Sequence, residues 1–240
     1  MKTYKIITCV FLFTSMFTQA CQKDDDSQDT PVPPEEEVPS SEFNYIYNQG
    51  TDGFELYRIP AIVKSKSNTL LAFAEARKAR SNGDSGDIDL VVKRSSDNGK
   101  TWSKQITIWN DGQNTCGNPV PIVDDRGRIH LLMTWNFQTD KWGAITNGTG
   151  EDSRRPYYTY SDDDGITWAQ PVEITSSVKK EKWDWYATGP CHGIQIQKGI
   201  HKGRLVAPNY FTTRESGKVT SYSHIIYSDD YGKTWKPGEP

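Results

Sequence analysis

Three copies of one octapeptide constrain this chain more than any other feature of its sequence. Each copy reads Ser-x-Asp-x-Gly-x-Thr-Trp, and the copies occupy residues 95–102, 161–168 and 228–235. Their first residues are 95, 161 and 228, which are 66 and then 67 residues apart. A near-constant period with one turn signal per repeat is typical of a fold built from repeated blades. The repeat therefore predicts a repeated architecture along most of the chain.

The residue types of the octapeptide are those of a tight turn between two strands. The Asp side chain can accept bonds from backbone N–H groups ahead of it, and the Gly can adopt the positive φ that a tight hairpin needs. Thr favours the return strand, and Trp supplies a large apolar ring to pack beneath the turn. A calcium-binding EF-hand is excluded at residues 162–165, because the acidic residues do not alternate and no Glu closes a twelve-residue loop.

Composition and strand-like runs favour an all-β fold. The chain has 12% aromatic residues, 19 Gly and 13 Pro, which suits strands joined by many turns. Strand-like runs precede the three octapeptides, and three further hairpins are predicted by turn-forming residues between apolar segments. The net charge of −3 comes without a basic stripe, so nothing indicates nucleic-acid binding. The runs are 88–93, 156–160 and 224–227, and the hairpins join 61–64 to 69–74, 120–123 to 128–135, and 194–197 to 204–207.

The first 42 residues are expected to lie outside the folded domain. Residues 1–20 combine two lysines with a short apolar run, which is typical of a secretory signal. Residues 18–21 resemble a bacterial lipobox in which Cys21 is acylated, although Thr18 replaces the usual Leu; the alternative is a secreted protein cleaved near Ala20. Residues 21–42 are acidic and Pro-rich, and we expect a flexible tether. This predicts a lipoprotein of the outer membrane, facing the cell surface or the periplasm, that contacts the membrane only through its lipid anchor.

The octapeptide is similar to the Asp box of sialidases and related β-propellers, and a second motif narrows the resemblance. Tyr57-Arg58-Ile59-Pro60 resembles the Phe/Tyr-Arg-Ile-Pro motif in the first strand of sialidases. The resemblance implies a propeller with six blades in the family, of which residues 43–240 supply about three. It also implies that Arg58 is one of three arginines that bind the substrate carboxylate, a role that suits the planar, permanently charged guanidinium.

Two further residues follow from the same resemblance. Arg77 is expected to contact the glycerol group and ring substituents of the sugar. Asp84, seven residues later, is expected to be the acid/base that protonates the glycosidic oxygen. Asp87 and Asp89 are the rivals for this role, Asp87 before Asp89. Both lie at the start of the following strand and are otherwise interpreted as structural or as facing solvent.

The sequence leaves two interpretations open at several positions. Asn118 could bind the amino-sugar substituent or simply form the turn before Pro119. Trp135 could line the pocket for the N-acetyl group or pack in the core. Residues 154 and 155 are arginines that could face substrate, with solvent as the default. Cys116 and Cys191 could form a disulfide or remain two separate thiols, and their spacing does not suggest a zinc site.

The resemblance implies a monomeric exo-α-sialidase that releases terminal sialic acid from glycoproteins, glycolipids and oligosaccharides without a cofactor or metal. Such enzymes use a Tyr nucleophile assisted by a Glu, together with two further pocket arginines, all in later blades. No segment before Pro240 matches these residues, so the chain is expected to be truncated and inactive by itself. The alternatives are a non-catalytic glycan-binding surface lipoprotein and an Asp-box glycosidase for another sugar, against which Arg58 argues.

Overall fold

The computed structural model describes residues 44–80 and 83–238. The expected signal peptide, the acylation site at Cys21 and the tether at 21–42 lie outside these residues. From Asn44 onward the chain forms one compact unit. In this described part, no helix is both long enough and apolar enough to cross a membrane.

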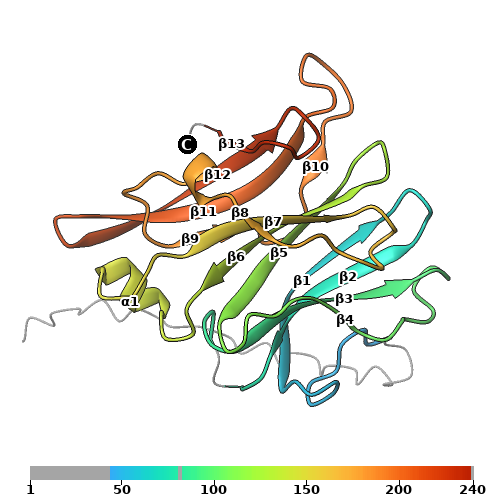
Figure 1. Ribbon diagram of the computed structural model, residues 1–240, viewed down its shortest axis with the longest axis horizontal. Coiled ribbons are helices and arrows are strands. Elements are labelled where there is room, and N and C mark those ends of the chain that lie inside the picture. Colours follow the sequence, from blue (N-terminus) through green and yellow to red (C-terminus); the bar gives the residue numbers. More distant parts are fainter. Residues whose placement is uncertain (1–43, 81–82, 239–240) are drawn as a thin grey trace, which may run out of the picture. The chain divides into compact units, whose positions relative to one another are not determined.

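The described strands form three antiparallel blades, which confirms the predicted all-β partial propeller (Figure 1). Within each blade, neighbouring strands pair in an antiparallel fashion, and the predicted hairpins are all present. The first blade contains β1 (Leu56–Lys64), β2 (Leu70–Arg77), β3 (Ile88–Ser95) and β4 (Ile106–Trp109). The second contains β5 (Thr115–Val123), β6 (Ile129–Asn136), β7 (Arg155–Ser161) and β8 (Val172–Glu173). The third contains β9 (Tyr186–Thr188), β10 (Ile194–Gln195), β11 (Leu205–Glu215), β12 (Lys218–Ser228) and β13 (Lys236–Pro237).

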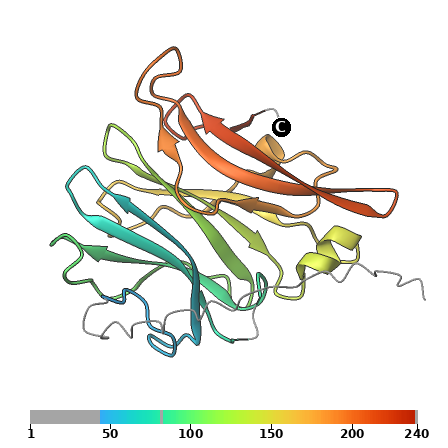
Figure 2. The same ribbon diagram turned by 180° about the vertical axis from the view of Figure 1, so that it is seen from behind.

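The first strands of the blades lie side by side, as both views show (Figure 1 and Figure 2). A single parallel pair, between Ile88 and Thr115, links the first two blades into one sheet. In the third blade, β9 and β10 both pair with β11, so together they form one interrupted inner strand. Two short helices, α1 (Trp142–Asn147) and α2 (Thr175–Val178), lie in the long connections before β7 and β9. The sequence did not predict these helices.

The three octapeptides form the same hydrogen-bonded turn. In the second copy the Gly165 N–H donates to Ser161 Oγ at 2.8 Å, and the Thr167 N–H donates to Asp163 Oδ1 at 2.8 Å. The corresponding bonds in the first and third copies measure 2.8 and 2.9 Å. The Gly of each copy has φ between +79° and +83°, a left-handed conformation that costs Gly little. The predicted roles of the Asp and the Gly in the turn are therefore confirmed, whereas the Thr lies outside the return strand and its hydroxyl donates to the Asp carboxylate.

Each later octapeptide also joins its blade to the preceding one. Trp168 of the second blade packs edge-on against Phe73 of the first, with ring centroids 5.7 Å apart. Trp235 of the third blade lies 5.6 Å from Tyr158 of the second. The two largest core clusters lie at these blade interfaces, one on each side of the second blade. The Trp side chains thus act between blades, which is more than the expected packing beneath their own turns.

Every inner strand is kinked at a residue with positive φ that precedes a proline. Ile59, with φ of +53°, precedes Pro60, and Asn118, with φ of +55°, precedes Pro119. At both places one extra residue is inserted relative to the partner strand, as a β-bulge. In the third blade the interruption between β9 and β10 begins at Gly189, with φ of +75°, before Pro190. A positive φ at the β-branched Ile59 is unusual, and such positions often accompany functional sites.

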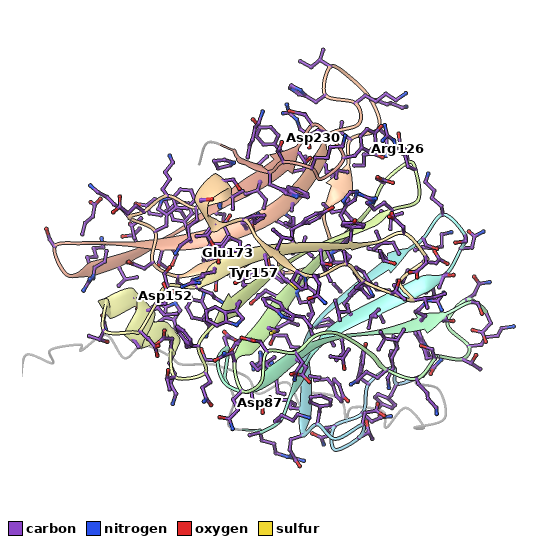
Figure 3. The ribbon with its side chains drawn as sticks, viewed as in Figure 1. Asp87, Arg126, Asp152, Tyr157, Glu173 and Asp230 are labelled. Carbon is purple, nitrogen blue, oxygen red and sulfur yellow. The ribbon has the colours of Figure 1, made fainter. Side chains whose placement is uncertain are left out.

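The two ends of the blades differ in character. Arg126 and Asp230 lie toward the end that carries the octapeptide turns, whereas Asp87 and Asp152 lie toward the other (Figure 3). The second end also carries the long connections between β2 and β3 and between β6 and β7. Long loops on a rigid scaffold are where binding sites usually form.

Candidate functional site

A buried glutamate organises the loop end of the first two blades. Glu75 and Arg77 lie on β2, two residues apart and therefore on the same face. Arg77 donates from Nε and Nη2 to Glu75 Oε2 at 3.1 and 2.5 Å, and both side chains are almost completely buried. The other oxygen of Glu75 accepts the Asn118 N–H of the neighbouring blade at 2.9 Å. Glu75 therefore fixes the Arg77 side chain and the bulge of β5 at once.

The contact between blades needs Gly117. A Cβ atom at this position would overlap the Glu75 carboxylate, so only glycine lets the two strands approach so closely. Sequence reasoning did not single out Glu75, although a signal was present. Leu71 and Phe73 share its face of β2 and are fully buried, so the strand periodicity placed two charged residues on a buried face.

Arg58 lies beside this cluster. It is directly opposite Glu75 in the β1–β2 register, and cross-strand partners extend to the same face of a sheet. Its side chain is exposed, and no ion pair or hydrogen bond involves it in the described part of the chain. The guanidinium is therefore available to a ligand. Its predicted role in carboxylate binding stays a prediction.

Asp84 lies next to Arg77 on the β2–β3 connection. Its Oδ1 is 3.2 Å from Arg77 Nη2, and its side chain is 54% exposed. The following residue anchors the loop, because Ser85 Oγ donates to the Asp140 carbonyl at 2.8 Å. An accessible carboxyl on an anchored loop is suited to proton transfer to a ligand, and the predicted role of Asp84 as the acid/base stays a prediction.

The two other acidic residues of this region lie differently. Asp89 is buried and accepts a bond from Asn110 Nδ2 at 2.6 Å. Burial raises the pKa of the Asp89 carboxyl. This agrees with its interpretation as structural. Asp87 is partly buried at the start of β3, and its carbonyl accepts the Lys78 N–H at 3.1 Å.

Asn118 on β5 and Trp135 on β6 have different surroundings. Asn118 is the left-handed residue of the β5 bulge, and its Oδ1 accepts a bond from Thr134 Oγ1 at 3.3 Å. Its role in the turn is therefore visible, and its contact with a sugar stays a prediction. Trp135 is 7% exposed in the cluster between the first two blades, and its indole N–H donates to Asp111 at 2.7 Å. This placement favours the core-packing alternative for Trp135.

Arg154 was expected to face solvent, and this expectation is wrong. The residue is 1% exposed, and its guanidinium stacks on Trp185 at 4.2 Å. Its Nε and Nη2 atoms are buried without a hydrogen-bond partner among the described residues. Burial lowers the pKa of the Arg154 guanidinium, and the nearby Glu75 carboxylate acts in the opposite direction. A second buried arginine therefore adds positive charge beside Arg77. The sequence could not show that the β6–β7 connection folds it inward.

A tyrosine–glutamate contact elsewhere does not match the expected nucleophile pair. Tyr157 Oη donates to Glu173 at 3.3 Å, but these residues lie on β7 and β8, the outer strands of the second blade (Figure 3). Burial and the Glu173 charge raise the pKa of the Tyr157 phenol, whereas a phenolate nucleophile needs the opposite. The pair therefore belongs to the outer edge of the second blade and is not the expected nucleophile pair.

Two cysteines lie in the described part of the chain. Cys116 is buried and Cys191 is exposed, and both are free thiols. Burial raises the pKa of the Cys116 thiol far above its usual value. Within the described ranges, no group of three or more His, Cys, Asp or Glu side chains could hold a metal ion.

Comparison with known proteins gives this geometry a family context. Residues 68–240 match the family described as "BNR repeat-like domain". The chain is 38% identical over 164 residues to an exo-alpha-sialidase of Aspergillus fumigatus, covering 61% of this chain and 40% of that protein. It is 32% identical over 202 residues to a sialidase of Clostridium perfringens, covering 81% and 50%.

A solved structure agrees with these sequence matches. The structure of a Hadza microbial sialidase superposes with a TM-score of 0.70 at 30% identity, covering 80% of this chain and 39% of that one. The chain thus spans half or less of the length of each of these three sialidases. Together, the family match, the relatives and the superposition show that the chain belongs to the BNR repeat-like family and is a sialidase-family protein.

Proposed function

We propose that the protein is an exo-α-sialidase and that this chain supplies the part of its site that binds the sugar carboxylate and donates the proton. The observation that supports this most is the cluster around Glu75. A buried carboxylate holds Arg77, which in turn touches the accessible Asp84 at 3.2 Å. Arg58 lies opposite Glu75 with its guanidinium free to bind. An anionic sugar is the ligand class that such paired guanidinium groups favour.

In the proposed reaction, each group acts at a different atom of the sialoside. Arg58 binds the carboxylate, and Arg77, held rigidly by Glu75, orients the ring substituents. Asp84 gives its proton to the glycosidic oxygen as the bond to the leaving sugar breaks. The nucleophilic Tyr, its Glu partner and the two further arginines are expected from portions of the matched sialidases that this chain does not cover.

The first test of this proposal measures binding, which does not depend on turnover. N-acetylneuraminic acid is titrated into the chain and followed by calorimetry or ligand-observed NMR. Arg58→Ala should weaken binding by about 10- to 100-fold, the effect of losing one charge-assisted pair. Arg58 is exposed, so the variant should keep the fold. Arg126→Ala is the matched control, because Arg126 is also exposed and lies toward the octapeptide end (Figure 3). Equal affinity in wild type and Arg58→Ala would contradict the proposal.

Hydrolysis is then measured on 3′-sialyl-lactose with a form that also carries the remainder of the propeller. Asp84→Asn should slow cleavage of this poor leaving group far more than cleavage of a fluorogenic aryl sialoside, because an aryl leaving group needs less protonation. A second candidate is a glycan-binding protein without activity, for which the exposed Arg58 guanidinium beside Glu75 would suffice. Binding that depends on Arg58, without hydrolysis in the complete form, would select that alternative.

We also propose that acylation at Cys21 attaches the protein to the outer membrane. The support is the lipobox-like sequence at residues 18–21 followed by an acidic tether. Incorporation of labelled palmitate into the wild type and its loss in Cys21→Ser would be the expected result. Release of soluble protein by both forms would reject the anchor.

A further inference from the structure

The chain enters the described fold at the octapeptide end of the blades. Asn44 is the first described residue, and its side-chain amide donates to the carbonyls of Gly99 and Lys100 in the first octapeptide. The segment that links Cys21 to the fold therefore joins it at this end, whereas the Glu75 cluster lies at the loop end. A lipid anchor at Cys21, as proposed above, would connect the blades to the membrane through their octapeptide end.

The β10–β11 connection projects from the same end (Figure 1 and Figure 2). Like the β1–β2 and β5–β6 connections, it follows an inner strand of its blade. Two backbone bonds close it, from the Lys202 N–H to the Gly199 carbonyl at 3.1 Å and from the Gly203 N–H to the Ile196 carbonyl at 2.8 Å. Ile200 is therefore held at the tip of a hydrogen-bonded turn.

Ile200 is almost completely exposed. Its exposed fraction is 96%, whereas the other large exposed hydrophobic residues of the described part reach at most 61%. Lys198 and Lys202 on either side are exposed too, and neither forms an ion pair among the described residues. A single exposed apolar residue is ordinary on a protein surface. An apolar tip between two ammonium groups has in addition the pattern that suits a membrane interface, where apolar groups enter the acyl boundary and cations meet phosphates.

Two further lysines lie around a cavity at this end. The cavity, of about 470 Å³, is bounded by the β1–β2 turn, the β5–β6 turn and the second and third octapeptides. Lys66 and Lys233 line it, are exposed and form no ion pair in the part of the chain that the structure describes. Arg126 lies in the same lining, with its guanidinium 3.4 Å from the centre of the Tyr231 ring (Figure 3). This stacked charge is fixed in the wall, whereas the two lysine ammonium groups are free to bind.

The carboxylates of this cavity are already bonded. They equal the basic groups of the lining in number, so the net charge alone does not decide which ligand fits. Asp162 pairs with Arg128 through two bonds of 2.7 and 2.8 Å. Asp163 accepts bonds within its own octapeptide, and Asp164 accepts a hydroxyl of the β1–β2 connection at 2.5 Å. Asp124 is buried and accepts N–H groups of its own turn. The groups left to bind a ligand are cationic, which favours an anion.

We propose that the octapeptide end is a membrane-facing surface that binds the phosphate groups of an anionic lipid layer. This inference rests on the proposed attachment of the protein to a membrane. Ile200 enters the boundary between headgroups and acyl chains, and the four lysines described above bind phosphates around it. Asp125, exposed in the β5–β6 turn, opposes these lysines and is outnumbered by them. In this orientation the Glu75 cluster faces away from the membrane, where glycans in solution can reach it.

Vesicle co-sedimentation tests the surface without the anchor. The full chain carries Cys21→Ser, so it cannot be acylated, and all variants share the remaining residues 1–43. We expect binding to vesicles of phosphatidylglycerol and phosphatidylcholine in equal parts, and little binding to phosphatidylcholine alone. Each basic residue near an anionic surface contributes about fivefold, so Lys198→Glu combined with Lys202→Glu should weaken binding by about 25-fold or more. Lys141→Glu combined with Lys182→Glu makes the same charge change in the connections before β7 and β9, at the loop end, and should have little effect.

The apolar contact and the cavity are tested by separate variants. Ile200→Ser should weaken vesicle binding by about fivefold, because its side chain no longer enters the acyl boundary. Ile200→Trp should retain binding, since an indole suits this boundary. Trp142→Ser is the matched control, because it removes an apolar side chain of 49% exposure at the loop end and should have no effect. Lys66→Glu combined with Lys233→Glu should weaken binding as much as the first pair of reversals.

The outcomes separate this surface from the lipid anchor and from the sialidase proposal, because none of them depends on Arg58. Palmitate on Cys21 of the wild type, together with no vesicle binding by the Cys21→Ser chain, would refute the surface and leave the anchor standing. Vesicle binding that depends on Ile200 and the lysines, without palmitate on Cys21, would support the surface and refute the anchor. Equal losses in the charge reversals at the two ends would overturn the proposed surface. Inorganic phosphate that shifts the lysine NMR signals of a chain that binds no vesicles would show a site for a soluble anion, and the lipid proposal would be wrong.

Discussion

The same glycine of the octapeptide can be substituted in all three copies, and its neighbours differ from copy to copy. Gly99, Gly165 and Gly232 have φ of +83°, +81° and +79°, so alanine introduces nearly the same backbone strain at each. Their surroundings differ. A Cβ at Gly99 would meet Leu70 at an ordinary 3.5 Å, whereas a Cβ at Gly165 would overlap Leu71 of the preceding blade.

The expected costs follow from these contacts. Left-handed strain alone should lower the free energy of unfolding of Gly99→Ala by about 1–2 kcal/mol. At Gly165 the overlap is with a fully buried side chain, which adds about 1–3 kcal/mol of overpacking. At Gly232 a Cβ would lie 2.5 Å from Tyr158 Oη and 2.7 Å from His130 Nδ1. It would therefore disturb their 2.8 Å hydrogen bond, at a similar additional cost.

Urea unfolding of the three variants measures these free energies directly, provided that the slope with denaturant is unchanged. The first copy is the internal control, because it has no preceding blade among the described residues. Gly165→Ala and Gly232→Ala should each be less stable than Gly99→Ala by at least about 1 kcal/mol. Equal destabilisation of all three would show that the octapeptide is only a local turn, and the argument for blade-to-blade packing would fail.

Three further predictions concern stability and reactivity. Glu75→Gln should lower the free energy of unfolding by about 3 kcal/mol, because Arg77 would lose its buried counter-charge and keep the half-exposed Asp84; a loss below about 1 kcal/mol in calorimetry would contradict this. Burial lowers the pKa of His224 to about 4 from an unfolded value of 6.5. Between these values only the unfolded chain binds the proton, so stability should fall by up to about 3 kcal/mol as the pH falls through this window. His224→Phe should flatten that pH dependence in denaturant titrations, and an unchanged slope would reject the cause. Iodoacetamide should label the exposed Cys191 and spare the buried Cys116, as peptide mass spectrometry can show; equal labelling would place both thiols at the surface.

The fold could be predicted from the sequence where the signals are local. The octapeptide turns and the hairpins depend on residues close together in the chain, and the strands appear where those signals placed them. The packing of Trp168 on Phe73 could not be predicted, because it depends on how one blade sits on another. The same holds for Arg154, whose burial against Trp185 depends on the path of a long connection.

The site was predictable only in part for a related reason. Arg58, Arg77 and Asp84 were identified by their motifs, and the structure brings all three around one feature that the motifs did not reveal, the buried Glu75 carboxylate. That group acts across two blades through Gly117 and Asn118. A single sequence does not show how the strands of one blade align with those of the next, so such a contact cannot be inferred from it.

The kinks in the inner strands give the scaffold a natural tolerance to change. β1 and β5 each contain one extra residue at a bulge. A change in the backbone on the loop side of the bulge therefore need not shift the strand pairing on its other side. Substitutions at Arg58 need not disturb the alignment of Ala61, which belongs to the core. Residues at the loop end of the blades could therefore change and bind new ligands while the packing of the core stays unaltered.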